Sequence, residues 1–176
     1  KQDKVFLPGE PLSARVVARA LCTSAVKRLF VMELHNPSIQ GFFDIPTYQL
    51  TFRDVFVRAL KPSLSPKSLV VSPDFGGIRR SRDFSDLLGV PLAYLDKTRD
   101  RQTGDVHFYR SSVPIGGRDC LLFDDLISTG ATAIAATRYL RSARAASVTF
   151  CATHGLFACG WDEFREAGFD RILVSD

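Results

Sequence analysis

Residues 120–140 read CLLFDDLISTGATAIAATRYL, and the order of residue types in this stretch decides the fold. The apolar residues 121–123 have the length and composition of a buried parallel strand. Asp124 and Asp125 stand where that strand is predicted to end. A loop of small and hydroxyl residues follows, and the Ala-rich segment from Ala131 onward has apolar residues at helical spacing. The stretch therefore predicts a strand–loop–helix unit with two carboxylates at the strand end.

The loop after the acidic pair has the chemistry of a phosphate-binding site. Backbone N–H groups at a helix start have no intrahelical partner, and the helix dipole adds partial positive charge there. Gly130 lets the backbone approach a ligand, and the hydroxyl donors around it are Ser128, Thr129 and Thr132. The alternative is an ordinary capped turn, because Ser, Thr, Asp and Gly are common turn residues. We favour the phosphate site because the loop follows two carboxylates.

The acidic pair predicts contacts to a different part of the same ligand. Carboxylates do not bind a phosphate directly. Asp124 and Asp125 can instead accept hydrogen bonds from sugar hydroxyls, or help to carry a Mg²⁺ ion. The stretch therefore predicts a site that binds both ends of a phosphorylated sugar.

Composition and charge limit the class of protein. The 176 residues are 45% hydrophobic and 24% charged, which predicts a folded globule with a substantial core. No apolar run is long enough for a bilayer and no secretory signal pattern is present, so we expect a cytoplasmic protein without membrane contacts. The formal charge of +4 suits anionic small molecules, and no dense basic run indicates nucleic-acid binding. The four cysteines lack C-x-x-C spacing, which favours reduced thiols over a disulfide or a zinc site.

Strands are predicted to alternate with helices along the chain, which is typical of an open, mainly parallel α/β sheet flanked by helices. The predicted strands are residues 29–32, 69–71, 92–95, 106–109, 121–123, 147–152 and 171–174. The predicted helices are residues 13–22, 52–60, 78–88, 161–167 and the segment that starts at residue 131.

Polar or charged side chains follow four of these strands. They are Glu33 and His35, Asp74, Asp124 and Asp125, and Thr153 and His154. Ligands of an open parallel sheet bind beyond the carboxyl ends of its strands. We therefore expect these side chains to converge on one crevice, and this regularity is the main evidence for an active site.

Two of these positions have competing interpretations. The segment Ser-Pro-Asp-Phe-Gly-Gly at residues 72–77 is either a simple turn or a second site for phosphate, with Asp74 facing Mg²⁺ or sugar hydroxyls. Next to a sugar-phosphate loop, a diphosphate site is the better interpretation. A histidine such as His35 is more often structural, but at a strand end it can bind a metal or neutralise phosphate charge.

The charged residues 96–104 are predicted to form a mobile loop. Lys97 and Arg99 within it are either solvated side chains or cations that a closing loop delivers to a reacting phosphate. Three more basic side chains lie at the start of the helix predicted after residue 77: Arg79, Arg80 and Arg82. The helix dipole disfavours positive charge there, and the sequence leaves open whether they face an anion, a partner or water.

Residues 124–132, Asp-Asp-Leu-Ile-Ser-Thr-Gly-Ala-Thr, resemble the phosphoribosyl-diphosphate (PRPP) binding motif of type I phosphoribosyltransferases and PRPP synthetases. Further blocks resemble the ribose-phosphate pyrophosphokinase (PRPP synthetase) family, in the order of that family: residues 8–15, 33–35, 40–46, 72–77, 96–99 and 153–155. The block Gly-Phe-Phe-Asp-Ile-Pro is the more specific signal, because ordinary phosphoribosyltransferases lack it. The resemblance covers nearly the whole chain.

The resemblance implies a type I phosphoribosyltransferase-like fold and a Mg²⁺-dependent enzyme. Such an enzyme transfers the diphosphoryl group of ATP to ribose 5-phosphate, giving PRPP and AMP, and works as a cytoplasmic homo-oligomer. Residues 1–50 would be the C-terminal remnant of an N-terminal phosphoribosyltransferase-like domain, and residues 51–176 the catalytic domain with the PRPP-binding loop.

Residue by residue, the resemblance also implies roles. The ribose 5-phosphate contacts are Asp124, Asp125, Ser128, Thr129, Gly130, Ala131 and Thr132. The ATP contacts are Gln2, Asp3 and His35, the metal contacts are His35 and Asp74, and the catalytic residues are Lys97, Arg99 and His35.

Departures from the family pattern leave two rivals open. Glu33 replaces the usual Asp, and Lys1 replaces an Arg whose forked guanidinium an ammonium does not imitate. Ser128 stands where many members carry Asp, and the family's chain is longer at both ends. The rivals are a type I phosphoribosyltransferase that consumes PRPP, and a non-catalytic regulatory subunit of a synthetase complex.

Overall fold

A computed structural model describes residues 2–5, 7–99 and 106–175 of the chain. At residues 98, 99, 106, 107 and 109 it describes the backbone alone. The chain divides into two compact units, Lys1–Phe52 and Arg53–Asp176, and each is described by itself.

The first unit contains a short parallel sheet and one helix. Its elements are α1 (Ser13–Cys22), β1 (Leu29–Met32), the 3₁₀ helix η1 (Pro37–Phe42) and β2 (Thr47–Leu50). The predicted bounds of α1 and β1 are confirmed. Strand β2 was not predicted; it pairs with β1 in parallel, and Tyr48 stacks on Phe30 with ring centroids 5.1 Å apart.

The second unit is a six-stranded sheet with helices on both faces. Its elements are α2 (Arg53–Leu60), η2 (Lys61–Ser63), β3 (Ser68–Ser72), α3 (Ile78–Leu88), β4 (Leu92–Arg99), β5 (Val106–Ser111), β6 (Asp119–Ile127), α4 (Ala131–Ser142), β7 (Ser147–Gly155), α5 (Asp162–Ala167) and β8 (Arg171–Val174). The strand order is β5-β4-β3-β6-β7-β8, and β4 with β5 is the antiparallel pair. The predicted fold class, a mainly parallel α/β sheet, is confirmed.

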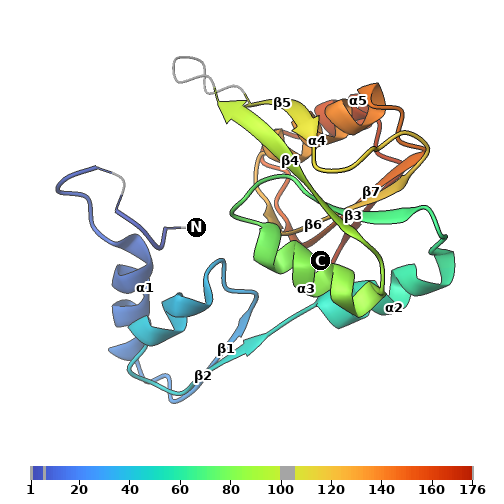
Figure 1. The fold of residues 1–176 in the computed structure, drawn as a ribbon. Helices are drawn as coiled ribbons and strands as arrows, with labels where there is room; N and C mark the ends of the chain where they lie inside the picture. Colours follow the sequence, from blue (N-terminus) through green and yellow to red (C-terminus); the bar gives the residue numbers. More distant parts are fainter. Residues whose placement is uncertain (1, 6, 100–105, 176) are drawn as a thin grey trace. The chain divides into compact units, whose positions relative to one another are not determined.

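The helices of this unit divide between the two faces of the sheet (Figure 1). On one face, Phe123 of β6 stacks on Phe84 of α3 and meets Phe56 of α2 edge-on. On the other face, Ile134 and Leu140 of α4 are buried in the core with strand residues. Strand β6 is apolar on both sides because helices cover both sides of it, as expected for a central parallel strand.

The connections define a switch point in the middle of the sheet. From β3 the chain runs through α3 to β4 on one side, and from β6 it runs through α4 to β7 on the other side. The two helices therefore diverge from neighbouring strands, and the predicted crevice corresponds to the region beyond the carboxyl ends of β3 and β6, where ligands of such sheets bind.

Five of the seven predicted strands are longer than expected, and the extensions of β6, β4 and β7 take in candidate site residues. Strand β6 continues past Asp124 and Asp125 to Ile127, so the prediction that the acidic pair follows the strand end is wrong. Strand β4 continues through Lys97 to Arg99, so Lys97 lies in a strand and not in a mobile loop. Both strands are extended by pairing with a neighbour, β7 and β5 respectively. Residues 100–105 of the predicted loop lie outside the described part of the chain.

No helix among the described residues combines the length and the apolar character that a membrane-spanning helix needs.

Candidate functional site

The acidic pair is accessible at the switch point because the pairing of β6 with β3 ends earlier along β6 than its pairing with β7. Strand β3 pairs with β6 only as far as Val71 opposite Leu122. On the other side, β6 stays paired with β7 until Ile127 lies opposite Gly155. Asp124 and Asp125 therefore lie inside β6 but beyond the end of its pairing with β3, at the switch point.

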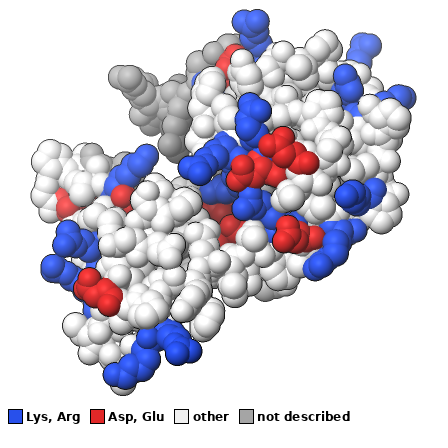
Figure 2. All heavy atoms as spheres, turned by 60° about the horizontal axis from the view of Figure 1, so that its bottom comes forward, with Lys and Arg blue, Asp and Glu red and all other residues white. Residues whose placement is uncertain are grey.

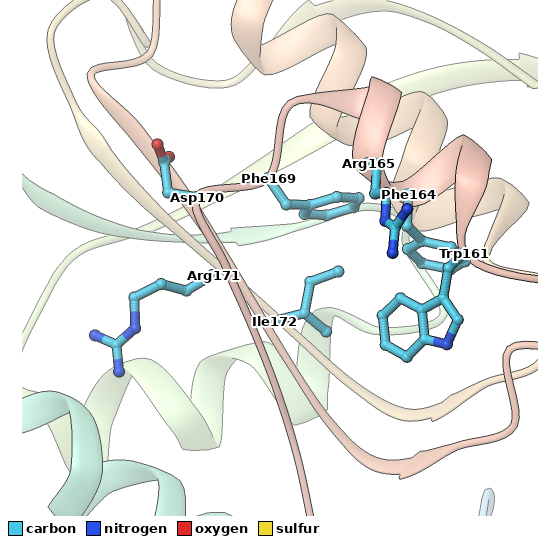
Figure 3. Close-up of a pocket in the computed structure, with 7 residues that line it drawn as sticks. All are labelled: Trp161, Phe164, Arg165, Phe169, Asp170, Arg171 and Ile172. Carbon is cyan, nitrogen blue, oxygen red and sulfur yellow. The ribbon is translucent and has the colours of Figure 1, made fainter.

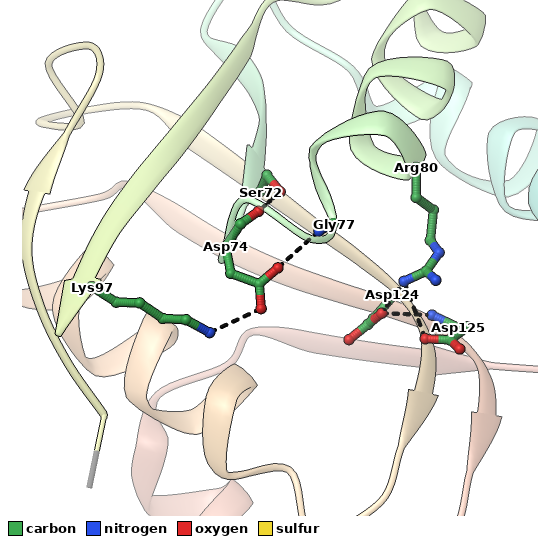
Figure 4. Close-up of polar contacts among 7 residues, drawn as sticks. All are labelled: Ser72, Asp74, Gly77, Arg80, Lys97, Asp124 and Asp125. Carbon is green, nitrogen blue, oxygen red and sulfur yellow. Dashed lines mark hydrogen bonds and ion pairs between the residues drawn. The ribbon is translucent and has the colours of Figure 1, made fainter. Parts of the chain in front are cut away.

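One arginine joins the two carboxylates. The Arg80 guanidinium, from the first turn of α3, donates a hydrogen bond to Asp124 Oδ1 and lies 3.1 Å from Asp125 Oδ1 (Figure 4). Asp124 Oδ1 also accepts the backbone N–H of Asp125 at 2.9 Å. The Asp125 side chain is 5% exposed and that of Arg80 18% exposed, so the contact is largely shielded from water.

The electrostatics of this pair are unusual for aspartates. The pKa of Asp124 is raised to about 7; burial is the largest cause, the hydrogen bond and negative charge of Asp125 add to the rise, and Arg80 opposes it. Two carboxylates that share one cation cannot both be fully compensated. The pair is therefore sensitive to anything that adds or removes a hydrogen-bond donor.

The loop after β3 carries a second carboxylate with its own cation. Asp74 Oδ1 accepts the Gly77 N–H at 2.8 Å, and Asp74 Oδ2 lies 2.9 Å from Lys97 Nζ, which extends from β4 (Figure 4). Ser72 Oγ donates to the Asp74 carbonyl at 2.8 Å and fixes the turn. Burial opposes the ionisation of Asp74, but the hydrogen bond and charge of Lys97, together with the Gly77 N–H and the charge of Arg80, outweigh burial, and the pKa of Asp74 is lowered.

The loop that was predicted to bind phosphate joins β6 to α4. Thr129 and Ala131 are exposed, whereas Ser128, Gly130 and Thr132 are partly buried. The N–H of Ala131 lies 3.4 Å from Thr129 Oγ1. The Ser128 carbonyl accepts the Ala158 N–H at 2.9 Å, so the loop is tied to the segment after β7 while its helix-start side stays open to solvent.

Gly130 is required by the fold as well as by any ligand. Its φ is +81°, which is strained for every residue with a side chain. A Cβ at this position would also lie 2.0 Å from the ring of Phe164 in α5. The sequence analysis ascribed Gly130 to close approach of a ligand, and the structure adds a close approach of Phe164.

The residues predicted to contact ATP lie in the first unit. Asn36 Nδ2 donates to Asp3 Oδ2 at 3.0 Å. Burial opposes the ionisation of Asp3, but the Asn36 hydrogen bond and the charge of His35 contribute to a lowered pKa. Asp3 and His35 are therefore near each other, and Gln2 precedes them on an exposed segment. The Glu33 carboxylate, at the end of β1, accepts hydrogen bonds from Thr51 Oγ1 and from the Phe52 N–H.

The remaining strand-end candidates lie within β7. Thr153 is fully buried, and its carbonyl accepts hydrogen bonds from Ser175. His154 is opposite Leu126 of β6, close to the sheet edge that carries the acidic pair. The structure thus brings Asp74, Lys97, Asp124 and Asp125 together at one edge of the second unit.

Arg80 is the residue of this site that sequence reasoning left undecided. The available signal was a cation in the first turn of a helix, where the dipole disfavours it. The partner that compensates this cost lies 44 residues away in the sequence, so only the fold identifies it.

The surface around these elements has mixed charge. On the face drawn in Figure 2, Lys and Arg side chains stand beside Asp and Glu side chains. Among the residues that the structure describes, no group of three or more His, Cys, Asp and Glu side chains could hold a metal ion. Cys120 and Cys151 are buried free thiols, and burial raises their pKa values to about 11 and about 12.

A separate pocket of about 220 Å³ lies beside α5 and β8 (Figure 3). Its lining is Trp161, Phe164, Arg165, Phe169, Asp170, Arg171 and Ile172. Phe164 belongs both to this lining and to the contact with Gly130, so the pocket backs onto the β6–α4 loop without opening into the crevice residues of Figure 4.

Comparison with known proteins places this geometry in a family. Residues 65–162, more than half of the chain, match the family model of the phosphoribosyl transferase domain. The ribose-phosphate pyrophosphokinase of Mycoplasma pneumoniae is 39% identical over 179 residues, which are 99% of this chain and 53% of that protein. The ribose-phosphate pyrophosphokinase of Mycobacterium leprae is 39% identical over 180 residues, which are 100% of this chain and 55% of that protein.

A solved structure agrees. The crystal structure of phosphoribosylpyrophosphate synthetase from Mycobacterium smegmatis superposes with a TM-score of 0.87 and 35% identity, over 98% of this chain and 56% of that one. The chain spans about half the length of the curated relatives it matches. The chain therefore belongs to the phosphoribosyl transferase domain family, and the relatives that it matches along nearly its whole length are ribose-phosphate pyrophosphokinases.

Proposed function

We propose that this chain forms the sugar-phosphate side of a ribose-phosphate diphosphokinase, which transfers the diphosphoryl group of ATP to ribose 5-phosphate and releases AMP. One observation carries the proposal: an acidic pair followed directly by a phosphate-type loop, at the switch point of the sheet. The relatives named ribose-phosphate pyrophosphokinase along nearly the whole chain support the same reading.

In this proposal the β6–α4 segment binds the sugar. The 5-phosphate lies against the N–H groups and hydroxyls of Ser128, Thr129, Gly130, Ala131 and Thr132, at the start of a 12-residue helix. Asp124 and Asp125 accept hydrogen bonds from the ribose hydroxyls. The exposure of the loop residues Thr129 and Ala131 is consistent with a phosphate that arrives from solvent.

The chemical step needs cations around the transferred group. The anomeric hydroxyl oxygen attacks the β-phosphorus of ATP, and the bond from that phosphorus to the α,β-bridging oxygen breaks. AMP departs with the bridging oxygen, and the hydroxyl proton passes to water. Lys97 and Arg99 supply positive charge to the phosphate oxygens in the transition state. Lys97 already extends into the crevice from β4, where its partner is Asp74; the side chain of Arg99 lies outside the described part of the chain.

The donors in the second unit fit a Mg²⁺ ion that the substrate phosphates complete. Mg²⁺ is commonly bound by one or two carboxylates plus phosphate oxygens and water, so a three-residue cluster is not required. Each Asp74 carboxylate oxygen accepts one hydrogen bond, from the Gly77 N–H or from Lys97 Nζ, and keeps a further lone pair. We propose Asp74 as a ligand of this ion, which would polarise the triphosphate and neutralise its charge. His35, in the first unit, is kept as a separate proposed metal contact. Gln2, Asp3 and His35 are proposed contacts of ATP, and a cytoplasmic homo-oligomer remains a prediction.

The test is an assay of the full-length gene product with ATP, ribose 5-phosphate and Mg²⁺, with AMP and PRPP both measured. We expect the two products in equal amounts. Consumption of PRPP with a nucleobase, without AMP formation from ATP and ribose 5-phosphate, would replace the proposal with a phosphoribosyltransferase. Activity that appears only after mixing with a second subunit would indicate the regulatory-subunit alternative.

A further inference from the structure

Arg80 makes two contacts that no other described cation of the second unit is shown to make: it touches both carboxylates of the acidic pair. A guanidinium is a planar fork whose N–H groups point in fixed directions, so one side chain can hold two carboxyl groups in a set relative orientation. An ammonium group concentrates its charge on a single nitrogen and does not provide this geometry.

The helix that carries Arg80 is itself held firmly. Ser81 is fully buried, and Phe84 of the same helix stacks on Phe123 of β6 with centroids 4.5 Å apart. Phe123 directly precedes the acidic pair. Arg80 and the acidic pair are therefore both attached to elements that pack in one core, which limits how far their side chains can move apart.

Two observations argue that this contact serves the site. The neighbours Arg79 and Arg82 on the same helix are exposed, so Arg80 is the member of the cluster that is turned inward. The charge of Arg80 also contributes to lowering the pKa of Asp74 and opposes the raised pKa of Asp124. One cation thus acts on both carboxylate groups of the crevice.

The hydrogen bonds that the acidic pair can offer to a sugar depend on its protonation state and on the direction of its oxygens. An ionised carboxylate accepts hydrogen bonds at both oxygens, whereas a protonated one presents a donor to the sugar hydroxyl. Without a cation, the two adjacent carboxylates would repel each other and rotate apart or take up a proton.

We propose that Arg80 is the positioning residue for sugar recognition: its guanidinium fixes the Asp124 and Asp125 carboxylates in the arrangement that accepts the ribose hydroxyls. This inference rests on the proposed function, because it assigns the sugar to the same acidic pair. Arg80 does not contact the reacting atoms, and it acts through the two carboxylates.

The test is titration calorimetry of the full-length protein with ribose 5-phosphate, together with steady-state kinetics. Arg80→Ala is expected to weaken sugar binding about 10- to 100-fold, the range of a lost hydrogen bond to a charged group. The KM for ribose 5-phosphate should rise by more than kcat falls. Arg79→Ala removes the same charge from the adjacent, exposed position and should bind the sugar within about twofold of the wild type.

A double-mutant cycle separates positioning from general support of the fold. In an Asp125→Asn background, Arg80→Ala should weaken binding by less than about threefold, because one of the two carboxylates that Arg80 orients has already been removed. An equal loss in both backgrounds, or sugar binding by Arg80→Ala within about twofold of wild type, would overturn the inference. Wild-type protein that binds no ribose 5-phosphate would overturn the proposed function and this inference together.

Arg80→Lys keeps the test valid if Arg80→Ala does not fold, as judged by circular dichroism. Lysine retains the charge but not the forked guanidinium. We therefore expect the affinity of Arg80→Lys for ribose 5-phosphate to lie between that of the wild type and the affinity, about 10- to 100-fold weaker, expected for Arg80→Ala. Wild-type affinity in Arg80→Lys would show that charge alone suffices, and the positioning role would be wrong.

Discussion

The two carboxylate sites at the sheet edge differ in how many carboxylates form an ion pair with the same cation. Asp74 has Lys97 to itself, and the pKa of Asp74 is lowered. Asp124 and Asp125 share Arg80, and the pKa of Asp124 is raised to about 7. Residues of one type, at neighbouring strands of one sheet, therefore have opposite shifts because of burial and the ratio of cations to carboxylates.

The difference in exposure suggests different tasks. The side chains of Lys97 and Asp74 are 28% and 33% exposed, so water and ligands can compete for their contact. Asp125 is 5% exposed and pairs with an arginine from a packed helix. We expect the first contact to exchange partners during a reaction cycle and the second to stay in place while a sugar binds.

The glycines of the two loops provide the largest expected contrast. Gly130→Ala should destabilise the fold, because the left-handed backbone costs about 1–2 kcal/mol for a residue with a Cβ. Overpacking against the Phe164 ring, which would lie 2.0 Å from the new Cβ, should add about 1–3 kcal/mol. Urea unfolding followed by circular dichroism measures the change.

Gly77→Ala is the matched control in the loop after β3. Its φ is −87°, and a Cβ there would meet Ser72 Oγ at 3.3 Å and Asp74 Oδ1 at 3.4 Å, both side-chain atoms. We expect a change within about 1 kcal/mol. Equal losses in the two variants would show that the Phe164 contact does not distinguish the loops.

The cations of the two sites should affect different kinetic constants. Lys97→Ala is expected to lower kcat about 100- to 1,000-fold, the range found when a group that stabilises transition-state charge is removed. Ribose 5-phosphate binding, measured by calorimetry, should change little. An unchanged kcat in this variant would remove Lys97 from the mechanism and leave its ion pair with Asp74 as a structural contact.

Much of the fold follows from local patterns in the sequence. Helices α1 and α3 were predicted with the bounds that the structure has, because both have apolar spacing and α3 has a clear stop at Gly89. Strand β6 was predicted too short, because Asp124 and Asp125 are poor strand formers whose extended backbone is imposed by pairing with β7. Strand β2 was not predicted, because its sequence has no apolar run and only its pairing with β1 defines it as a strand.

The site could be located from the sequence but not assembled. The strand-end rule grouped Asp74, Asp124 and Asp125, and the structure places these carboxylates near one another, although the acidic pair lies inside β6. The ion pairs could not be inferred, because Lys97 and Asp74 are 23 residues apart and Arg80 and Asp124 are 44 apart. Side-chain direction in the fold, which no local pattern encodes, decided which arginine faces inward.

A pH titration of stability sharpens the comparison at the shared site. The pKa of Asp124 rises from 3.8 to about 7 on folding, so the folded state binds more protons in this range and the free energy of unfolding falls as pH rises. Asparagine has no proton to lose. Asp124→Asn should therefore be more stable relative to wild type at about pH 8 than at about pH 4, as measured by urea unfolding.

Asp86→Asn, which changes an exposed carboxylate on α3, serves as the control for that titration. It shows how much an Asp→Asn change at an exposed position alters the measured stability under the same two conditions. Parallel pH profiles for wild type and Asp124→Asn would contradict the raised pKa and, with it, the view that one guanidinium leaves this pair incompletely compensated.

The smallest expected effect, with the opposite sign, belongs to Asp74. Its pKa is lowered on folding, so its contribution to stability is present above the unfolded value of 3.8 and is lost as pH falls through the folded value. Asp74→Asn should cost up to about 1 kcal/mol near pH 7, the range of partly exposed ion pairs. An asparagine Oδ1 can still accept the Gly77 N–H, so the variant removes charge and keeps the turn. The cost should shrink at about pH 3 and at high salt, and a cost that persists under both conditions would mean that it does not come from the lost charge of Asp74.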